Sequence, residues 1–315
     1  MSEEEKKPST LAKVKETLKN LPGASLLFAI GPLMVLGYLG WYYYGAEHLD
    51  RALYSLKQEN IKVVSPAPPW IKADVVDEVY RTAGLDRISL LDVTATATVA
   101  QAFETHVWVK SVPNVRKGAN GALQVDLIFR RPVAMVYYKG PVQDGNGVKE
   151  IKGFYPVDSE GIVLPGEDFL PDPDEDASES EYNKYFQIFA GKNGVPPASS
   201  IGMPFGDPRI TEAISLCIYL EKLRDQLGIK ELEIAQEQFS LGPSPYLHVL
   251  LTGESPPRKI IWGHAPDKEV SGEPKPEDKK QRLISWLSDS EQSEGQLTLD
   301  LRSSSSIIPV SNSRY

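Results

Sequence analysis

Residues 107–134 read VWVKSVPNVRKGANGALQVDLIFRRPVA, and this stretch decides the fold. Leu123, Val125 and Leu127 alternate with polar residues, which is the period-2 pattern of a half-buried strand. Residues 107–116 form a second strand candidate, and Gly118 to Gly121 supply the turn between the two. Pro132 has no N–H to donate, so we expect strand pairing to end there or to move to a sheet edge.

The elements before this stretch complete a small α+β unit. Residues 61–64 read as a short strand, and two helices are expected over residues 71–83 and 96–105. The expected order is therefore strand, helix, helix, strand, strand. Two helices on one face of a three-stranded sheet can enclose a core within about 80 residues.

A membrane anchor is expected upstream. Residues 24–46 contain no charge and as a helix would be about 34 Å long, enough to cross a bilayer. Trp41, Tyr42, Tyr43 and Tyr44 stand at the C-terminal end, where such rings lie at the headgroup level. Five lysines precede this segment and only Arg51 and Lys57 follow closely, which predicts a cytoplasmic N-terminus and an exported remainder.

A second mixed α/β domain is expected downstream, with a mainly antiparallel sheet. A hairpin turn is expected at Asp158–Gly161, where we expect the carboxylates to cap their own backbone. Asp207-Pro208 starts a helix that Gly228 ends. Further strands are expected at residues 232–235, 246–251, 259–262 and 296–302, with a short helix at 281–287.

Two polar stretches interrupt this domain. Residues 166–181 carry eight acidic residues and no basic one, but they lack the calcium-binding loop pattern, so a solvated, mobile insertion is expected. Residues 265–280 are charged and contain prolines, and we expect a flexible linker. The expected division is residues 1–23 cytoplasmic tail, 24–46 membrane helix, 47–60 juxtamembrane segment, 61–136 first domain, 137–302 second domain and 303–315 disordered tail.

Composition and motifs argue against several classes of function. The net charge of −9 disfavours a nucleic-acid-binding protein. Cys217 is the only cysteine and lies in an apolar helix pattern, so it is expected to be buried rather than nucleophilic. His264 is expected to be a surface imidazole, and the four histidines lack metal-ligand spacing. We expect no enzyme, no cofactor, no metal site and no small-molecule substrate.

In combination the segments resemble the FtsQ/DivIB family of bacterial division proteins. The resemblance rests on WVKSVPNVR at 108–116, LQVDLIFRRPVA at 123–134, VDSEGIVL at 157–164, KIIWG at 259–263 and LDLR at 299–302. Two positions depart from the family pattern: Phe129 replaces a common Glu, and Ser303 replaces an aromatic residue.

The resemblance implies a polypeptide-transport-associated (POTRA) domain over residues 61–136 and an FtsQ-type β domain after it. It also implies a non-enzymatic scaffold in the bacterial inner membrane, at the division site, that binds bitopic division proteins similar to FtsB and FtsL. A terminal strand can accept a partner segment as an added strand. The expected partner-binding residues are Leu297, Thr298, Leu299, Asp300, Leu301 and Arg302. The alternatives are a membrane-anchored POTRA protein of envelope assembly or secretion, and a cell-wall enzyme.

Overall fold

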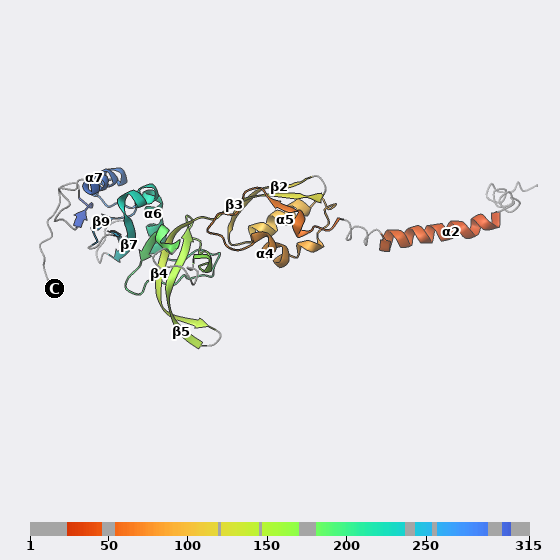
Figure 1. Ribbon diagram of the computed structural model, residues 1–315, viewed down its shortest axis with the longest axis horizontal. Helices are drawn as coiled ribbons and strands as arrows, with labels where there is room; N and C mark the ends of the chain where they lie inside the picture. The colour runs from red at the N-terminus through yellow and green to blue at the C-terminus, as the bar shows by residue number, and fades with distance from the viewer. Residues whose placement is uncertain are drawn as a thin grey trace, which may run out of the picture.

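The computed structural model describes residues 24–45, 54–118, 121–144, 147–169, 181–236, 243–253, 257–288 and 298–303. Within these residues the protein is a mixed α/β structure with two sheets (Figure 1). The α-helices are α2 (Ala24–Gly40), α4 (Val75–Thr82), α5 (Ala95–Glu104), α6 (Pro208–Leu227) and α7 (Pro276–Ser288). The strands are β1 (Ile61–Val63), β2 (Val109–Lys117), β3 (Leu123–Phe129), β4 (Pro132–Asp144), β5 (Gly147–Asp158), β6 (Phe186–Phe189), β7 (Ile229–Gln236), β8 (Tyr246–Thr252), β9 (Lys259–Gly263) and β10 (Thr298–Asp300).

The first sheet has three strands in the order β1-β3-β2 and carries helices α4 and α5. The strand-helix-helix-strand-strand order expected from the sequence is confirmed. Strand β3 lies in the centre, parallel to β1 and antiparallel to β2. Its inward residues Leu123, Val125 and Leu127 are buried and Gln124 is exposed, as the alternation predicts.

The second sheet has seven strands in the order β10-β9-β8-β7-β6-β4-β5. The pairs β4–β5, β7–β8 and β8–β9 are antiparallel, whereas β4–β6, β6–β7 and β9–β10 are parallel. The expectation of a mainly antiparallel sheet is therefore confirmed only in part, since three of the six strand pairs that the structure describes are parallel and the sheet is mixed. A parallel partner needs a long crossover connection, and α6 and α7 lie in two of these connections, between β6 and β7 and between β9 and β10.

The longest ladder of this sheet was not expected from the sequence. Strand β4 begins at Pro132 and pairs with β5 from Pro132↔Asp158 to Asp144↔Gly147. Pairing in the first sheet does stop before Pro132, but the chain resumes at once as a strand of the second sheet. Residue 136, the expected domain boundary, falls inside β4. The turn at Asp158–Gly161 is present. The expected hairpin around it is limited to one isolated bridge, Val157↔Val163, across the turn.

Helix α6 has the ends that the sequence predicts. The Asp207 carboxylate accepts a hydrogen bond from Arg209 N at 2.9 Å, Pro208 is the first helical residue, and Gly228 ends the helix with φ +62°. Cys217 is fully buried in the core that α6 forms with the sheet, and burial raises the pKa of its thiol. This confirms Cys217 as a core residue.

The two sheets meet through a shared hydrophobic core. Trp108, directly before β2, is 1% exposed, and its ring centroid lies 6.2 Å from that of Phe169. Met135 and Leu164 are buried in the same cluster. Phe169 is the aromatic residue inside the acidic stretch 166–181, so the start of that stretch is packed into the core rather than solvated. Residues 170–180 of the insertion lie outside the described residues.

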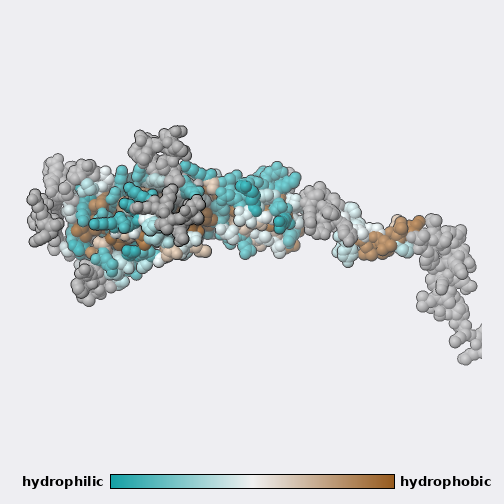
Figure 2. All heavy atoms as spheres, turned by 90° about the horizontal axis from the view of Figure 1, so that it is seen from below, coloured by the Kyte–Doolittle hydropathy of each residue, from teal (hydrophilic) through white to brown (hydrophobic). Residues whose placement is uncertain are grey.

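The N-terminal segment consists of α2 followed by a π-helical turn, Trp41–Gly45. No helix within the described residues is long and apolar enough to cross a membrane. The expected membrane-spanning helix over residues 24–46 is therefore not supported, because α2 is 17 residues long and the regular α-helix ends at Gly40. From Ile30 on, its large apolar side chains are exposed, among them Leu33 and Met34, and Figure 2 shows this brown surface apart from the main body of the molecule.

Candidate functional site

The C-terminal strand β10 forms one end of the seven-stranded sheet, so it has an outer edge (Figure 1). Its parallel register with β9 places Thr298 beside Lys259, Leu299 beside Ile260 and Asp300 beside Ile261. No further strand pairs with β10 among the residues that the structure describes. The sequence therefore placed the candidate strand at a sheet edge correctly.

The direction of the backbone groups on β10 follows from one hydrogen bond. Leu301 N donates to Ile261 O at 2.9 Å, so the N–H of Leu301 points toward β9. The N–H and C=O groups of successive strand residues point to alternate edges. The backbone groups of Thr298 and Asp300 therefore point outward, away from β9.

The side chains of β10 divide between the core and the surface. Leu299 and Leu301 are buried in the core of the second sheet. On the other face, Arg302 donates to both carboxylate oxygens of Asp300, through Nε at 3.1 Å and Nη2 at 2.7 Å. Burial alone would raise the pKa of Asp300, but these hydrogen bonds hold it below its usual range. Asp300 and Arg302 therefore stiffen the end of the strand.

Helix α7 reaches the outer edge of β10 through Arg282. Its Nη1 donates to Ser303 O at 2.5 Å and its Nη2 donates to Asp300 O at 3.3 Å. The outward carbonyl of Asp300 therefore already accepts a hydrogen bond within the protein. The outward N–H groups of Thr298 and Asp300 donate no hydrogen bond to any residue in the described part of the chain. Sequence reasoning missed Arg282, because no local signal links residues 18 positions apart.

The other expected interface residues have mixed outcomes. Leu297 lies outside the described residues. The rings of Trp41, Tyr42 and Tyr43 are exposed on the π-helical turn, and the side chain of Tyr44 is not described. These aromatic residues are grouped as expected, but nothing in their contacts shows what surrounds them.

A buried polar cluster lies beside β9 and corrects two expectations. His264 is 2% exposed, and its Nδ1 lies 2.7 Å from Glu273 Oε2, so it is not a surface imidazole. Lys279 is fully buried, and its Nζ donates to Glu273 Oε1 at 2.7 Å and stands 5.3 Å from the Trp262 ring centroid. Residues 265–280 are therefore not a flexible linker, since Glu273 ties them to β9 and α7.

Glu273 is the centre of this cluster. Its carboxylate also accepts from His264 N at 3.0 Å and from Val270 N at 3.1 Å. Burial alone would raise the pKa of Glu273, but the bonds from Lys279 and these backbone donors hold it below its usual range. Gly263 has φ +92°, and a Cβ at that position would overlap the Glu273 carboxylate. The ion pair thus requires a glycine at the end of β9.

His248 on β8 is the second buried histidine of this region. Its Nδ1 lies 3.2 Å from Gly263 O, and because a carbonyl only accepts, Nδ1 carries the proton. Burial lowers the pKa of His248 to about 4, with further lowering from His264 and Lys279 and opposition from Gly263 O and Glu273.

Stability is expected to fall in acid because of His248. The pKa of a histidine in an unfolded chain is about 6.5, so below that pH the unfolded state binds a proton that the folded state excludes. The loss grows as the pH falls from 6.5 to about 4, where it reaches roughly 3 kcal/mol. Urea unfolding of wild type and His248→Asn across this range measures it. An equal pH slope in both proteins would contradict the assignment.

Arg130, which precedes Pro132, contacts the turn after β5 at the junction between the two sheets. Arg130 Nη1 donates to Asp158 Oδ2 at 2.5 Å and to Glu160 Oε2 at 3.0 Å. Asp158 is buried, and its Oδ1 accepts from Glu160 N and Ile162 N, which confirms that this carboxylate caps its own turn. These residues hold the chain where it passes from one sheet to the other.

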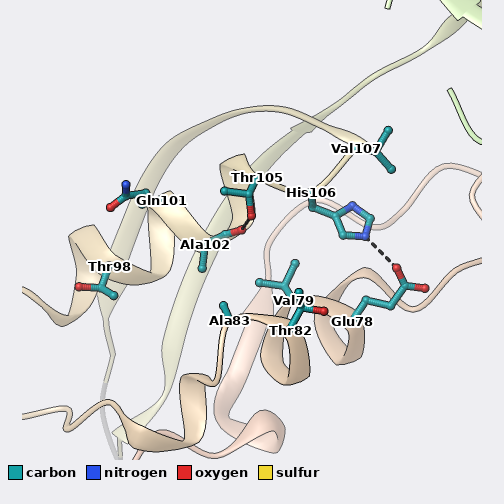
Figure 3. Close-up of a pocket in the computed structure, with 10 residues that line it drawn as sticks. All are labelled: Glu78, Val79, Thr82, Ala83, Thr98, Gln101, Ala102, Thr105, His106 and Val107. Atoms are coloured by element: carbon teal, nitrogen blue, oxygen red, sulfur yellow. Dashed lines mark hydrogen bonds and ion pairs between the residues drawn. The ribbon is translucent and has the colours of Figure 1, made fainter. Parts of the chain in front are cut away.

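A groove of about 540 Å³ lies between α4 and α5 (Figure 3). At one end His106 Nε2 lies 3.0 Å from Glu78 Oε2, while Trp108 N donates to His106 Nδ1 at 3.2 Å. Both ring nitrogens are therefore engaged, and His106 has a structural role. No group of three or more His, Cys, Asp or Glu side chains in the described ranges could hold a metal ion.

No protein-family model and no curated protein matches the chain.

Proposed function

We propose that this protein is a non-enzymatic, membrane-anchored scaffold of the bacterial division machinery. In this proposal it binds other bitopic division proteins, similar to FtsB and FtsL, through its exported domains. The carrying observation is the outer edge of β10, where the backbone groups of Thr298 and Asp300 point away from the sheet. The FtsQ/DivIB-like motifs, in register over residues 108–302, support the family assignment.

Strand addition at β10 is compatible with the packing of that strand. Burial of Leu299 and Leu301 uses one face of β10, whereas an added strand would use its edge. Two hydrogen bonds also fix the position of the strand: Leu301 N donates to Ile261 O of β9, and Arg282 of α7 donates to Asp300 O. A partner segment would therefore meet a pre-ordered edge, which lowers the entropy cost of binding.

Proline at Thr298 tests this mechanism. The substitution removes the outward N–H and leaves an opposing partner carbonyl without a donor, which costs about 1–3 kcal/mol. We expect the affinity for a division partner to fall by about 5-fold to 150-fold, because each 1.4 kcal/mol corresponds to a tenfold change in Kd. The measurement is a pull-down with the full chain in detergent, followed by titration of the captured partner.

Thr298→Val is the matched control, because valine keeps the N–H and suits a strand. It is expected to bind like wild type, and circular dichroism must show that both variants are folded. Equal binding by wild type, T298V and T298P would refute the edge-strand mechanism. Absence of any captured division protein with wild type would remove the main support for the scaffold.

Export of the sheets is the second part of the proposal. The uncharged segment 24–46 with five lysines before it supports a single-pass anchor whose N-terminus is cytoplasmic. Helix α2 and the π-helical turn that follows it present apolar and aromatic side chains to the surroundings. A phosphatase fused after Arg302 is expected to be active in cells, and a reporter that works only in the cytoplasm is expected to be silent there. The reverse pattern would end the envelope placement.

A further inference from the structure

Three apolar side chains, Tyr54, Leu91 and Val93, are exposed at one end of the three-stranded sheet, and we name them the apolar tip. Their exposed fractions are 43%, 60% and 91%. The backbone holds them together: Leu90 N donates to Tyr54 O at 2.7 Å, and Ser55 bridges Ser89. Single exposed apolar residues are common, but three on two adjoining backbone segments call for a reason.

The turn that carries Leu91 and Val93 is held firmly in place. Asp92 Oδ1 accepts from both the N and the Oγ1 of Thr94 at 2.8 Å. From the neighbouring strand β2, Lys117 Nζ donates to Leu90 O and to Asp92 O at 2.6 Å. These bonds satisfy the turn's backbone and leave its two apolar side chains pointing away from the core.

The apolar tip lies at the membrane-proximal end of the sheet if α2 is the anchor. Residues 46–53 separate Gly45 from Tyr54, and this length of chain reaches at most roughly 30 Å. Figure 1 shows the three-stranded sheet as the part of the molecule next to α2. The apolar tip lies at the N-terminal end of α5. Val107, which follows the C-terminal end of α5, faces Gly202 in the second domain, so the tip lies at the end of α5 away from that domain.

We infer that the apolar tip contacts the lipid surface and orients the exported sheets on the membrane. This inference rests on the membrane anchor proposed above. Leucine and valine can enter the boundary between headgroups and acyl chains, and tyrosine suits the headgroup level. A lipid bilayer is the occupant that this chemistry and the short connection to α2 favour.

Fluorescence quenching in vesicles tests the contact with the full chain. The only native cysteine, Cys217, is fully buried, so single cysteines placed on the surface can be labelled selectively. The labelled variants are Val93→Cys at the apolar tip, Met203→Cys as an exposed apolar control in the second domain, and Leu36→Cys in α2. Each is reconstituted into vesicles of phosphatidylethanolamine and phosphatidylglycerol that contain a nitroxide-labelled lipid, with the nitroxide near the headgroup for Val93 and Met203 and deep on the acyl chain for Leu36.

Quenching at Val93 is expected to exceed that at Met203 at least about twofold, because only the tip enters the interface. Quenching at Leu36 with equal, low quenching at Val93 and Met203 would overturn the inference and leave the anchor standing. Quenching at Val93 without quenching at Leu36 would keep the lipid contact and remove the anchor. Quenching at neither position would overturn both.

Discussion

Replacement of Glu273 by alanine is expected to lower the free energy of unfolding by about 3–5 kcal/mol, the usual cost of breaking a buried ion pair. The variant leaves the fully buried Lys279 ammonium without its carboxylate. It also leaves His264 N and Val270 N without their acceptor. Because these donors belong to three segments around β9, the loss should be cooperative. Urea unfolding of the full chain, followed by circular dichroism, measures it.

Lys279→Met provides the informative comparison for Glu273→Ala. Methionine fills similar volume, and the Glu273 carboxylate would keep its donors from His264 and Val270. The loss is therefore expected to be smaller than in E273A. Lys275→Ala, an exposed position just before α7, is the neutral control and should change stability by less than about 0.5 kcal/mol. An E273A protein as stable as the Lys275→Ala control would refute the buried network.

Replacement of Trp108 by alanine is expected to cost about 3–5 kcal/mol, because it opens a cavity in the core that joins the sheets. Trp108 is among the largest fully buried side chains, and it belongs to a core cluster that contains residues of both sheets. Phe169 packs on it from the acidic stretch, while Met135 comes from β4. The variant should therefore loosen the junction as well as the first sheet. Thermal unfolding and limited proteolysis between residues 129 and 147 measure the two effects.

A double-mutant cycle separates the junction from a general loss of core. Trp108→Ala and Phe169→Ala are expected to be less than additive, because their rings contact each other and either change disrupts the shared packing. Ile128→Ala, at a half-exposed position of β3, is the control with a small effect. Additive effects of the Trp108 and Phe169 substitutions would show that the two sheets have independent cores.

Structural features that depend on residues adjacent in sequence are predicted well from the sequence. The ends of α6 are determined by Asp207, Pro208 and Gly228, which act on their own neighbours in sequence, so the sequence predicts them well. The buried face of β3 and the turn at Asp158 are equally local. The β4–β5 hairpin was missed because Pro132 signals a stop, although proline at the first residue of a strand leaves the rest of the ladder intact.

The candidate site shows the same division. That residues 298–300 form a strand with a buried face follows from the alternation of leucines and polar residues. Which edge is exposed, and which N–H groups point outward, depends on the parallel register with β9. The contact of Arg282 with Asp300 O depends on where α7 lies. The residues next to Arg282 and Asp300 in the sequence therefore do not predict this contact.

Neighbouring residues alone specify the order of elements in the first sheet, the ends of α6, the burial of Cys217 and the two faces of the edge strand. The mixed pairing of the second sheet and the packing of Phe169 in the first core depend on contacts between residues distant in sequence. Only the fold places His264, Glu273 and Lys279 in a buried network rather than in a flexible, charged linker. The physical reason is that a charged side chain is excluded from a core only when it lacks a partner. That partner is supplied by the fold, not by the adjacent residues.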